Sequence, residues 1–566
     1  MSPSAFPIKR LALLAAIAHL SLGLTGARAT VFTWDGGGSD DRFDTGLNWS
    51  GDIAPSPGSS TDLHFAGGAR LTPSNPFADG SDLGSIIFDS GAGAFNVGGN
   101  SVNLFGSIEN NSTTAQNVSL TSISLAAATA FRLTSGDLTF GLTGAGGNLL
   151  NNGNTLHVYG GSTPNGNLLT FSAGTVMTGS GGLEMHTNST VQFLSAQTYT
   201  GATQIDEGRL FVAGTIGNNT GAIFLGNSTP AYANAVVANL FITSSGLNMA
   251  NEITVNKSDT GTAKGLTGHL IDGTFTSGTT ILSGGIVLNG DLGISQSTGG
   301  TLKITGVIRD GTDTGFTSHA VSINSTGRKG TVVFTANNTY TGITTISNGG
   351  TLELNNDGTT NTGRIGGSSR VTVNRDTTLL LSGSGSVRDR LNNTATVILG
   401  AGTTTNAGGL LNTGGLSEGT APTGPGGSGC VVGIGSLTLQ AKGTIDFTSA
   451  NGGSELVFQT LNFVSGTVAN ILDWTGTAGG DGLDRLLFAT NPNLTTNDLR
   501  FVQFTNDAGI NFAIGGMIIP FNGYYEMVPV PEPATWAGAV VSLIAVALSQ
   551  RRRLAATVAK ARRIRS

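Results

Sequence analysis

Cysteine is almost absent from this chain, because its 566 residues include only one, Cys430. A single thiol excludes a framework of internal disulfide bonds and any metal site built from several cysteines. No basic residue stands near Cys430 in the sequence to favour a thiolate, so we expect no catalytic role for it.

Charged residues are also scarce, at 11% of the chain against about 25% in ordinary globular proteins. Disordered chains are charged and poor in apolar residues, so a chain with 38% hydrophobic residues is not expected to be disordered. The 88 glycines indicate many tight turns. No segment between Leu83 and Phe458 has a sustained helical period, which excludes the strand–helix–strand units of nucleotide-binding folds.

Acidic residues are missing from both ends of the chain. None precedes Thr30 and none follows Glu532, whereas three basic residues lie in the first 29 positions and seven lie from Arg551 onward. Without these ten, 18 basic residues face 34 acidic ones between residues 30 and 532, a net charge of −16. A body this acidic does not bind phosphates by charge, so we expect no nucleic acid partner.

One pattern of about 20 residues occurs twice, at 191–212 and 332–354. Each copy contains an aliphatic-x-Phe triplet, the segment Gln/Asn-Thr-Tyr-Thr-Gly, a Thr-x-Ile triplet, a glycine and a Leu-x-aliphatic triplet; the second copy has one extra residue before its last triplet. Such triplets favour short strands with one inward face. The inward residues expected from the two copies are Phe193, Ile205, Leu210, Phe334, Ile346 and Leu352.

Similar triplets fill the chain between the two copies, and three short strands in about 20 residues are typical of one turn of a parallel β-solenoid. The repeated pattern resembles the autotransporter-associated β-strand repeat, which occurs in large secreted bacterial proteins with β-helical bodies. We therefore expect an all-β fold, a right-handed parallel β-helix with a cap at each end.

The expected division of the chain has five parts. They are a signal peptide at 1–29, an N-terminal cap at 30–82, a solenoid at 83–460, a β-rich C-terminal cap at 461–528 and a sorting tail at 529–566.

The first 29 residues have the order of parts of a secretory signal peptide. Lys9 and Arg10 precede the apolar run Leu11 to Leu24, and the small residues Ala27 and Ala29 flank a cleavage site after Ala29. A membrane anchor is the alternative, but the apolar run is short for a span.

The tail begins with Val530-Pro531-Glu532-Pro533, continues with an apolar stretch expected to cross the membrane at about 534–549, and then contains Arg551, Arg552 and Arg553. This order resembles the PEP-CTERM sorting signal, which implies cleavage by an exosortase while the arginines remain on the cytoplasmic side. The prolines keep the site extended. An ordinary anchor explains the apolar stretch and the arginines but not Pro-Glu-Pro. The chain departs from the usual pattern by continuing for 13 residues after Arg553.

Trp34 and Trp49 allow two interpretations near the start of the body. They could form a stacking platform for sugars, or they could close the end of the solenoid core. We favour the second interpretation, because the terminal turns of solenoids are atypical and their edges need cover. Nearby, Asp40 and Asp41 lack the regular spacing of a calcium loop.

No catalytic, cofactor-binding or metal-binding residue is expected from the sequence. Neither of the adjacent carboxylate pairs Asp40-Asp41 and Asp206-Glu207 is a ready acid/base couple, because neighbours in a strand point to opposite faces. The five histidines after the signal peptide have no metal-ligand spacing; they are His64, His157, His186, His269 and His319.

These observations predict a secreted, non-enzymatic structural or adhesive protein of the cell surface or extracellular matrix. The expected processing partners are signal peptidase and an exosortase, with transient contact to the inner membrane. The expected lasting partners are exopolysaccharide or other copies of the chain. The alternative is a carbohydrate-active β-helix enzyme, a polysaccharide lyase or hydrolase. A true autotransporter is disfavoured, because no series of membrane strands closes the chain.

Overall fold

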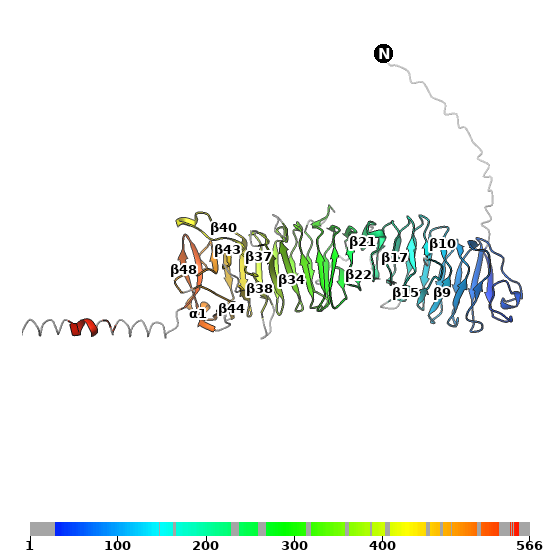
Figure 1. Cartoon of the computed structure of the whole chain (residues 1–566), viewed down its shortest axis with the longest axis horizontal. Helices are drawn as coiled ribbons and strands as arrows, with labels where there is room; N and C mark the ends of the chain where they lie inside the picture. The colour runs from blue at the N-terminus through cyan, green and yellow to red at the C-terminus, as the bar shows by residue number, and fades with distance from the viewer. Residues whose placement is uncertain are drawn as a thin grey trace, which may run out of the picture.

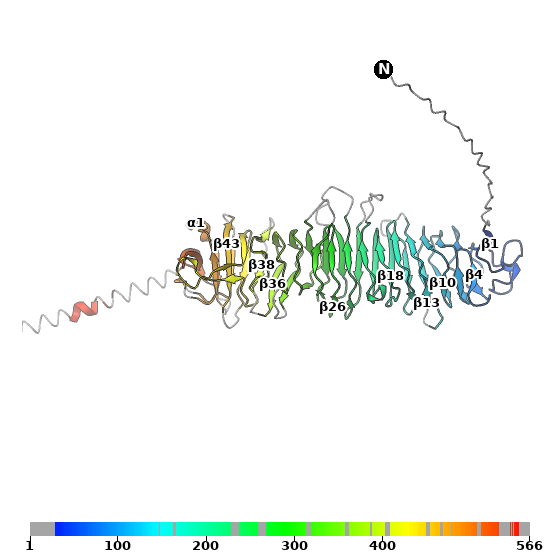
Figure 2. The same cartoon turned by 90° about the horizontal axis from the view of Figure 1, so that it is seen from above.

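The strands stack into one elongated rod, with the first turns at one end and the last strands at the other (Figures 1 and 2). The all-β solenoid expected from the sequence is thereby confirmed in this computed structural model. The residues that the structure describes are 29–145, 148–161, 166–227, 237–257, 268–312, 318–356, 362–384, 388–401, 408–448, 453–464, 468–476, 478–480, 482–506, 511–530, 544, 546 and 548–553.

Sheet A is a parallel ladder of 12 strands along one side of the rod. Its strands, in order along the rod, are β1 (Thr30–Trp34), β2 (Thr61–Phe65), β5 (Ile86–Phe88), β8 (Ile108–Asn110), β11 (Thr129–Leu133), β14 (Leu156–Tyr159), β17 (Leu183–His186), β19 (Thr203–Ile205), β21 (Ile223–Leu225), β24 (Ile253–Val255), β27 (Ile286–Leu288) and β30 (Ile308–Asp310).

Sheet B runs along nearly the whole rod and is parallel up to its last two strands. Its strands are β3 (Ser74–Asn75), β6 (Asn96–Gly99), β9 (Gln116–Leu120), β12 (Leu138–Phe140), β15 (Leu168–Phe171), β18 (Ser189–Phe193), β20 (Gly208–Val212), β22 (Ala238–Ile242), β25 (His269–Gly273), β28 (Leu292–Gln296), β31 (Val321–Ile323), β33 (Thr344–Ile346), β35 (Arg370–Asn374), β37 (Thr396–Ala401), β41 (Ile434–Leu439), β43 (Glu455–Phe463), β45 (Arg485–Phe488), β49 (Tyr524–Pro529) and β48 (Gly516–Phe521).

The third side is divided between sheet C and sheet D. The strands of sheet C are β4 (Ser81–Leu83), β7 (Val102–Leu104), β10 (Ile123–Leu125), β13 (Asn148–Leu150) and β16 (Val176–Thr178). Those of sheet D are β23 (Asn248–Met249), β26 (Thr279–Leu282), β29 (Thr301–Ile304), β32 (Thr331–Phe334), β34 (Thr351–Asn356), β36 (Thr378–Gly383), β38 (Leu410–Asn412), β42 (Thr444–Asp446), β44 (Ala469–Leu472), β46 (Val502–Thr505) and β47 (Asn511–Ile514).

A small antiparallel pair lies outside these ladders, and helical structure among the described strands and loops is brief. The remaining elements are β39 (Gly419–Thr420), β40 (Val431–Val432), the 3₁₀ turns η1 (Gly46–Asn48), η2 (Gly217–Asn219) and η3 (Pro425–Gly427), and the helix α1 (Thr496–Leu499).

The core forms because alternate residues of each strand point inward and stack on the same position of the next turn. Phe140 pairs with Phe171 in the ladder, and Phe171 pairs with Phe193. Their ring centroids lie 5.5 Å and 4.9 Å apart, and all three side chains are fully buried. The six core residues expected from the two repeats are likewise buried; they are Phe193, Ile205, Leu210, Phe334, Ile346 and Leu352.

The two repeats keep the same local geometry although they lie on different sides of the rod. The first copy alternates between sheets B and A, and the second between sheets D and B. In both copies the tyrosine is buried and its hydroxyl hydrogen-bonds to the threonine four residues later: Tyr199 to Thr203 at 2.6 Å and Tyr340 to Thr344 at 2.7 Å. The sequence pattern therefore determines the shape of the bend, not the side on which it falls.

A glycine with positive φ begins the last strand of the first copy and shortly precedes the last strand of the second. Gly208 has a φ of 110°, and a Cβ added there would lie 2.0 Å from the carbonyl oxygen of Ser189 on the previous turn. Gly349 occupies the corresponding bend in the second copy with a φ of 80°. Any side chain at Gly208 would separate the two turns, which explains why glycine stands in the motif.

Aromatic residues close the N-terminal end of the rod. Trp34 and Trp49 are fully buried and meet edge to face with ring centroids 5.1 Å apart. The indole Nε1 of Trp49 donates to the carbonyl oxygen of Phe43 at 2.7 Å. Neither indole has an exposed face on which a sugar could stack, so the geometry favours the closing role.

At the C-terminal end the ladder changes from parallel to antiparallel. Strand β46 pairs antiparallel with β47, and β49 lies antiparallel between β45 and β48. Parallel pairing extends from β1 to β46, beyond the span 83–460 expected from the sequence. The buried columns of the core continue through Phe65 and Phe488. The sequence around these two residues was not predicted to belong to the solenoid.

We expect Phe334→Ala to lower the free energy of unfolding by about 3–5 kcal/mol, because it removes a buried ring and leaves a cavity. The loss should be confined to a few turns, since each turn contacts only its neighbours. Native-state hydrogen exchange measures both effects, with Thr339→Ala, an exposed site in the same repeat, as the control. Faster exchange spread evenly along the rod would contradict this account.

Candidate functional site

A column of polar and aromatic side chains lies on the outer face of sheet A. Strand pairing places Glu109, Arg132, Tyr159 and His186 at the same position on four successive turns. The guanidinium carbon of Arg132 lies 4.3 Å from the Tyr159 ring centroid, and the Tyr159 and His186 rings stack at 4.7 Å. Arg132 also reaches Glu109 at 3.6 Å.

The next turn adds Asp206 to this column. Its backbone N–H donates to the carbonyl oxygen of Met185, which extends the ladder one residue beyond β19. One carboxylate oxygen of Asp206 then lies 2.9 Å from Nδ1 of His186. Strand β17 ends at His186 because Thr187 and Asn188 both adopt the left-handed conformation, with φ of 46° and 52°.

A second column brings His157 and Glu184 beside His186. His157 pairs with Glu184 in the ladder between β14 and β17. Nδ1 of His157 lies 3.2 Å from Oε2 of Glu184 and 3.2 Å from Nε2 of His186, and Nε2 of His186 lies 3.6 Å from Oε1 of Glu184. We call these three residues the His–Glu–His cluster. Their ligand atoms lie within 4.8 Å of one another, so the cluster could hold a metal ion.

The cluster is partly open to solvent. The side chains of His157, Glu184 and His186 are 28%, 33% and 19% exposed, whereas Asp206 behind them is 9% exposed. Burial lowers the pKa of His157, and the Glu184 carboxylate opposes this by favouring the charged ring. Burial raises the pKa of the neighbouring Glu207.

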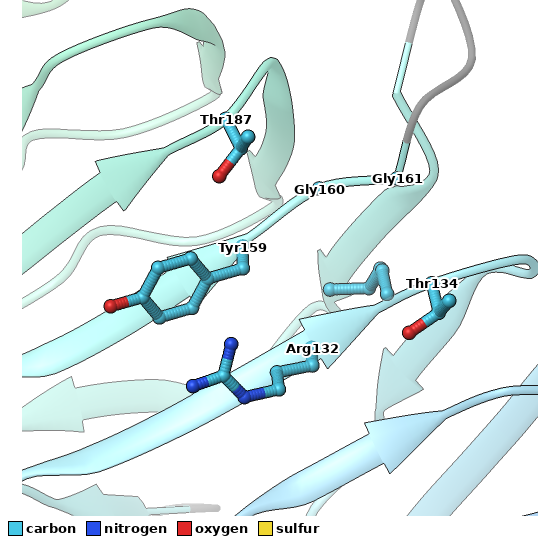
Figure 3. Close-up of a pocket in the computed structure, with 7 residues that line it drawn as sticks. Arg132, Thr134, Tyr159, Gly160, Gly161 and Thr187 are labelled. Atoms are coloured by element: carbon cyan, nitrogen blue, oxygen red, sulfur yellow. The ribbon is translucent and has the colours of Figure 1, made fainter. Parts of the chain in front are cut away.

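A hollow of about 330 Å³ lies next to the Arg132–Tyr159 stack (Figure 3). The two side chains lie next to each other on adjacent strands, with Thr187 from the following turn nearby. The Tyr159 ring lies between Arg132 and His186, so neither ring face is open to a ligand. The hollow offers a guanidinium, hydroxyl groups and glycine backbone; its lining residues are Arg132, Leu133, Thr134, Tyr159, Gly160, Gly161 and Thr187.

Sequence reasoning missed the His–Glu–His cluster. Its histidines are 29 positions apart, and no motif links them along the chain. They meet only because the stacking register places β14 beside β17. Outward-facing polar residues can be recognised in each strand from the sequence. Which of them lie side by side depends on the length of the turn between the strands, and the sequence does not show that length.

The other histidines lie apart from the cluster. His64 is also on sheet A, where its Nδ1 lies 2.9 Å from Asp89. His269 and His319 are buried in other turns. Cys430 is half-buried near Tyr524, and burial raises the pKa of its thiol, which disfavours the thiolate.

The processing residues named from the sequence lie mostly outside the described residues. Ala27, Pro531, Glu532 and Pro533 are among those that the structure does not describe. Ala29, Val530 and residues 551–553 are described and exposed. Among the described residues, no helix has the length and apolar character needed to cross a membrane.

The buried His269 predicts a pH dependence of stability. Burial lowers the pKa of His269 to about 4 from an ordinary value of 6.5, and its Nδ1 accepts a hydrogen bond from the backbone N–H of Ala238. The unfolded chain takes up a proton below 6.5 while the folded chain does not, so stability falls as the pH drops from about 6.5 to about 4. Over this range, His269 lowers the free energy of unfolding by a slope that approaches about 1.4 kcal/mol per pH unit.

His269→Gln keeps a side-chain acceptor and removes this titration, so its unfolding free energy should fall less steeply over the same range. Urea unfolding at a series of pH values measures the two slopes. Equal slopes for the two proteins would show that His269 does not carry the effect.

Comparisons of the chain with protein-family models, with curated proteins and with solved structures found no match. The resemblance of the two repeats and of the tail to known sequence signals therefore stays a prediction from the sequence.

Proposed function

We propose that this chain is a secreted, non-enzymatic scaffold of the cell surface or extracellular matrix. In this proposal the solenoid is right-handed, residues 1–29 direct secretion, and a helix at about 534–549 holds the chain in the inner membrane. An exosortase then cuts near Val530-Pro531-Glu532-Pro533 and transfers the body to the surface.

The observation that carries the proposal is a polar row on the outer face of sheet B. Asn117, Thr139, Thr170 and Gln192 occupy one position on four successive turns. Neighbouring strands are about 4.8 Å apart, so amide and hydroxyl groups recur at even spacing over these four turns. Phe211 and Phe241 occupy the same position on the next two turns. An evenly spaced polar row suits a partner that is itself repetitive, such as a polysaccharide or a second copy of the rod.

The closed ends support binding through the sides. The unpaired edge of β1 is covered by residues 46–50, which include η1, with Ser50 donating its backbone N–H to the carbonyl oxygen of Thr33 at 2.8 Å. At the other end, the antiparallel strands β47 and β48 follow the last parallel turns. End-to-end growth through open strand edges is thereby hindered, and the long faces remain as the contact surfaces.

A carbohydrate-active enzyme is the second candidate. The hollow beside Arg132 and Tyr159 favours it, because a cationic group next to a hollow of this size could bind an acidic sugar. Glu184 and Asp206 lie close by, but each carboxylate contacts a histidine. The two carboxylates lie on opposite sides of the His186 ring, which each of them contacts through a different nitrogen.

The processing claim predicts the mass of the mature protein. Protein isolated from the native host should begin at Thr30 and contain no residue beyond about Trp536 by intact-mass analysis. Glu532→Ala should leave an uncleaved, membrane-retained form, while Glu252→Ala, at a 55% exposed site on the rod, should be processed normally.

A wild-type protein that keeps its arginine-rich tail in the inner membrane would contradict the sorting claim.

Incubating the mature protein with acidic polysaccharides separates the two candidate functions. The scaffold releases no product, whereas product release that is abolished by Glu184→Gln would support the enzyme.

A further inference from the structure

We propose that His157, Glu184 and His186 bind one divalent transition-metal ion, with Zn²⁺ the best fit. The inference is independent of the scaffold function, because it rests on the side chains of two adjacent turns of sheet A. The ligands are Nδ1 of His157, a carboxylate oxygen of Glu184 and Nε2 of His186.

The ligand atoms of the three residues lie close enough together to share one metal ion. Zn²⁺ binds imidazole nitrogen and carboxylate oxygen at about 2.0–2.2 Å, so tetrahedral ligand atoms are about 3.3–3.6 Å apart. In the cluster the two nitrogens are 3.2 Å apart. Nδ1 of His157 lies 3.2 Å from Oε2 of Glu184, and Nε2 of His186 lies 3.6 Å from Oε1, the other oxygen of the same carboxylate. One ligand atom from each residue can therefore be chosen with all three within 4.8 Å of one another, and small side-chain shifts would bring them to the separations of a bound ion.

A second set of contacts prepares His186 as a ligand. Its Nδ1 lies 2.9 Å from Oδ2 of Asp206, and a proton on Nδ1 donates to that carboxylate. The lone pair is then on Nε2, which faces His157 and Glu184. Metal-binding histidines commonly have a carboxylate partner on the far nitrogen, which fixes the tautomer and the ring orientation. Stacking on Tyr159 further restrains the ring.

The donor set indicates the class of metal. Two imidazoles and one carboxylate suit Zn²⁺ and its first-row neighbours, whereas Ca²⁺ and Mg²⁺ require mostly oxygen ligands. Three protein ligands leave a fourth position, and the partial exposure of all three side chains leaves it facing solvent. A water molecule or a group from outside the chain can therefore complete the coordination.

The same contacts also form a hydrogen-bonded ladder without a metal, with His157 donating to His186. Titration calorimetry with ZnCl₂ distinguishes a metal site from a metal-free ladder. The protein is the full-length chain, produced without a polyhistidine tag and stripped with a chelator. We expect one saturable site per chain. His157→Ala and His186→Ala should each weaken binding at least tenfold, and Asp206→Asn about 10–100-fold. CaCl₂ should give no saturable binding at this site.

His64→Ala is the matched control, because His64 also lies on the outer face of sheet A and contacts a carboxylate. It should leave Zn²⁺ affinity unchanged.

Glu184→Gln keeps the side-chain volume and should weaken Zn²⁺ binding without unfolding the protein, which circular dichroism verifies. Co²⁺ in place of Zn²⁺ should give the visible absorption of a tetrahedral site, lost in His186→Ala. Absence of saturable Zn²⁺ binding, or equal losses in His64→Ala and His186→Ala, would overturn the proposal.

Discussion

Hydrogen bonding between stacked turns is the interaction on which every other feature of this rod depends. Many of its strands have only three residues, as in β5, β12 and β19, and strands that short are not stable alone. Each becomes stable by pairing with the turn before and the turn after it. The pairing keeps equivalent residues side by side, so inward residues such as Phe140, Phe171 and Phe193 form one continuous column.

The same register arranges the outer surface. A residue that points outward on one turn lies beside the residue at the same position on the next, about 4.8 Å away. On sheet B this produces a row of amide and hydroxyl groups over four turns, from Asn117 to Gln192. On sheet A it brings a guanidinium, a phenol and an imidazole into one stack. Clusters of polar side chains such as the His–Glu–His cluster therefore arise between turns rather than within any one segment.

The N-terminal end illustrates how burial decides between two interpretations of the same residue type. Trp34 and Trp49 are the residue type expected at either a sugar platform or the end of a core. Their rings pack against Phe43 and Phe65 and have no exposed face. Trp34 and Trp49 therefore close the solenoid core and offer no ring face to a ligand.

The fold class followed from the sequence because its signals are local. Triplets with period two, frequent glycine and the motif around Tyr199 and Tyr340 each specify a strand or a bend without reference to distant residues. The register could not be predicted, because turn length varies. Thr203 lies 20 residues after its partner Leu183, whereas Leu240 lies 30 after Leu210. The His–Glu–His cluster depends on that register and was missed for this reason.

The central claim is that successive turns pair in register, and disulfide trapping tests it most directly. Thr139 and Thr170 are partners on adjacent turns of sheet B, and Gln192 is one turn further. In a Cys430→Ser background, Thr139→Cys with Thr170→Cys should oxidise to a disulfide, because paired strands lie within the Cα separation that a disulfide allows. Thr139→Cys with Gln192→Cys should stay reduced, since two turns place the residues about 9–10 Å apart. Mass spectrometry that finds the second pair linked, or the first pair unlinked, would contradict the register and every outer column built on it.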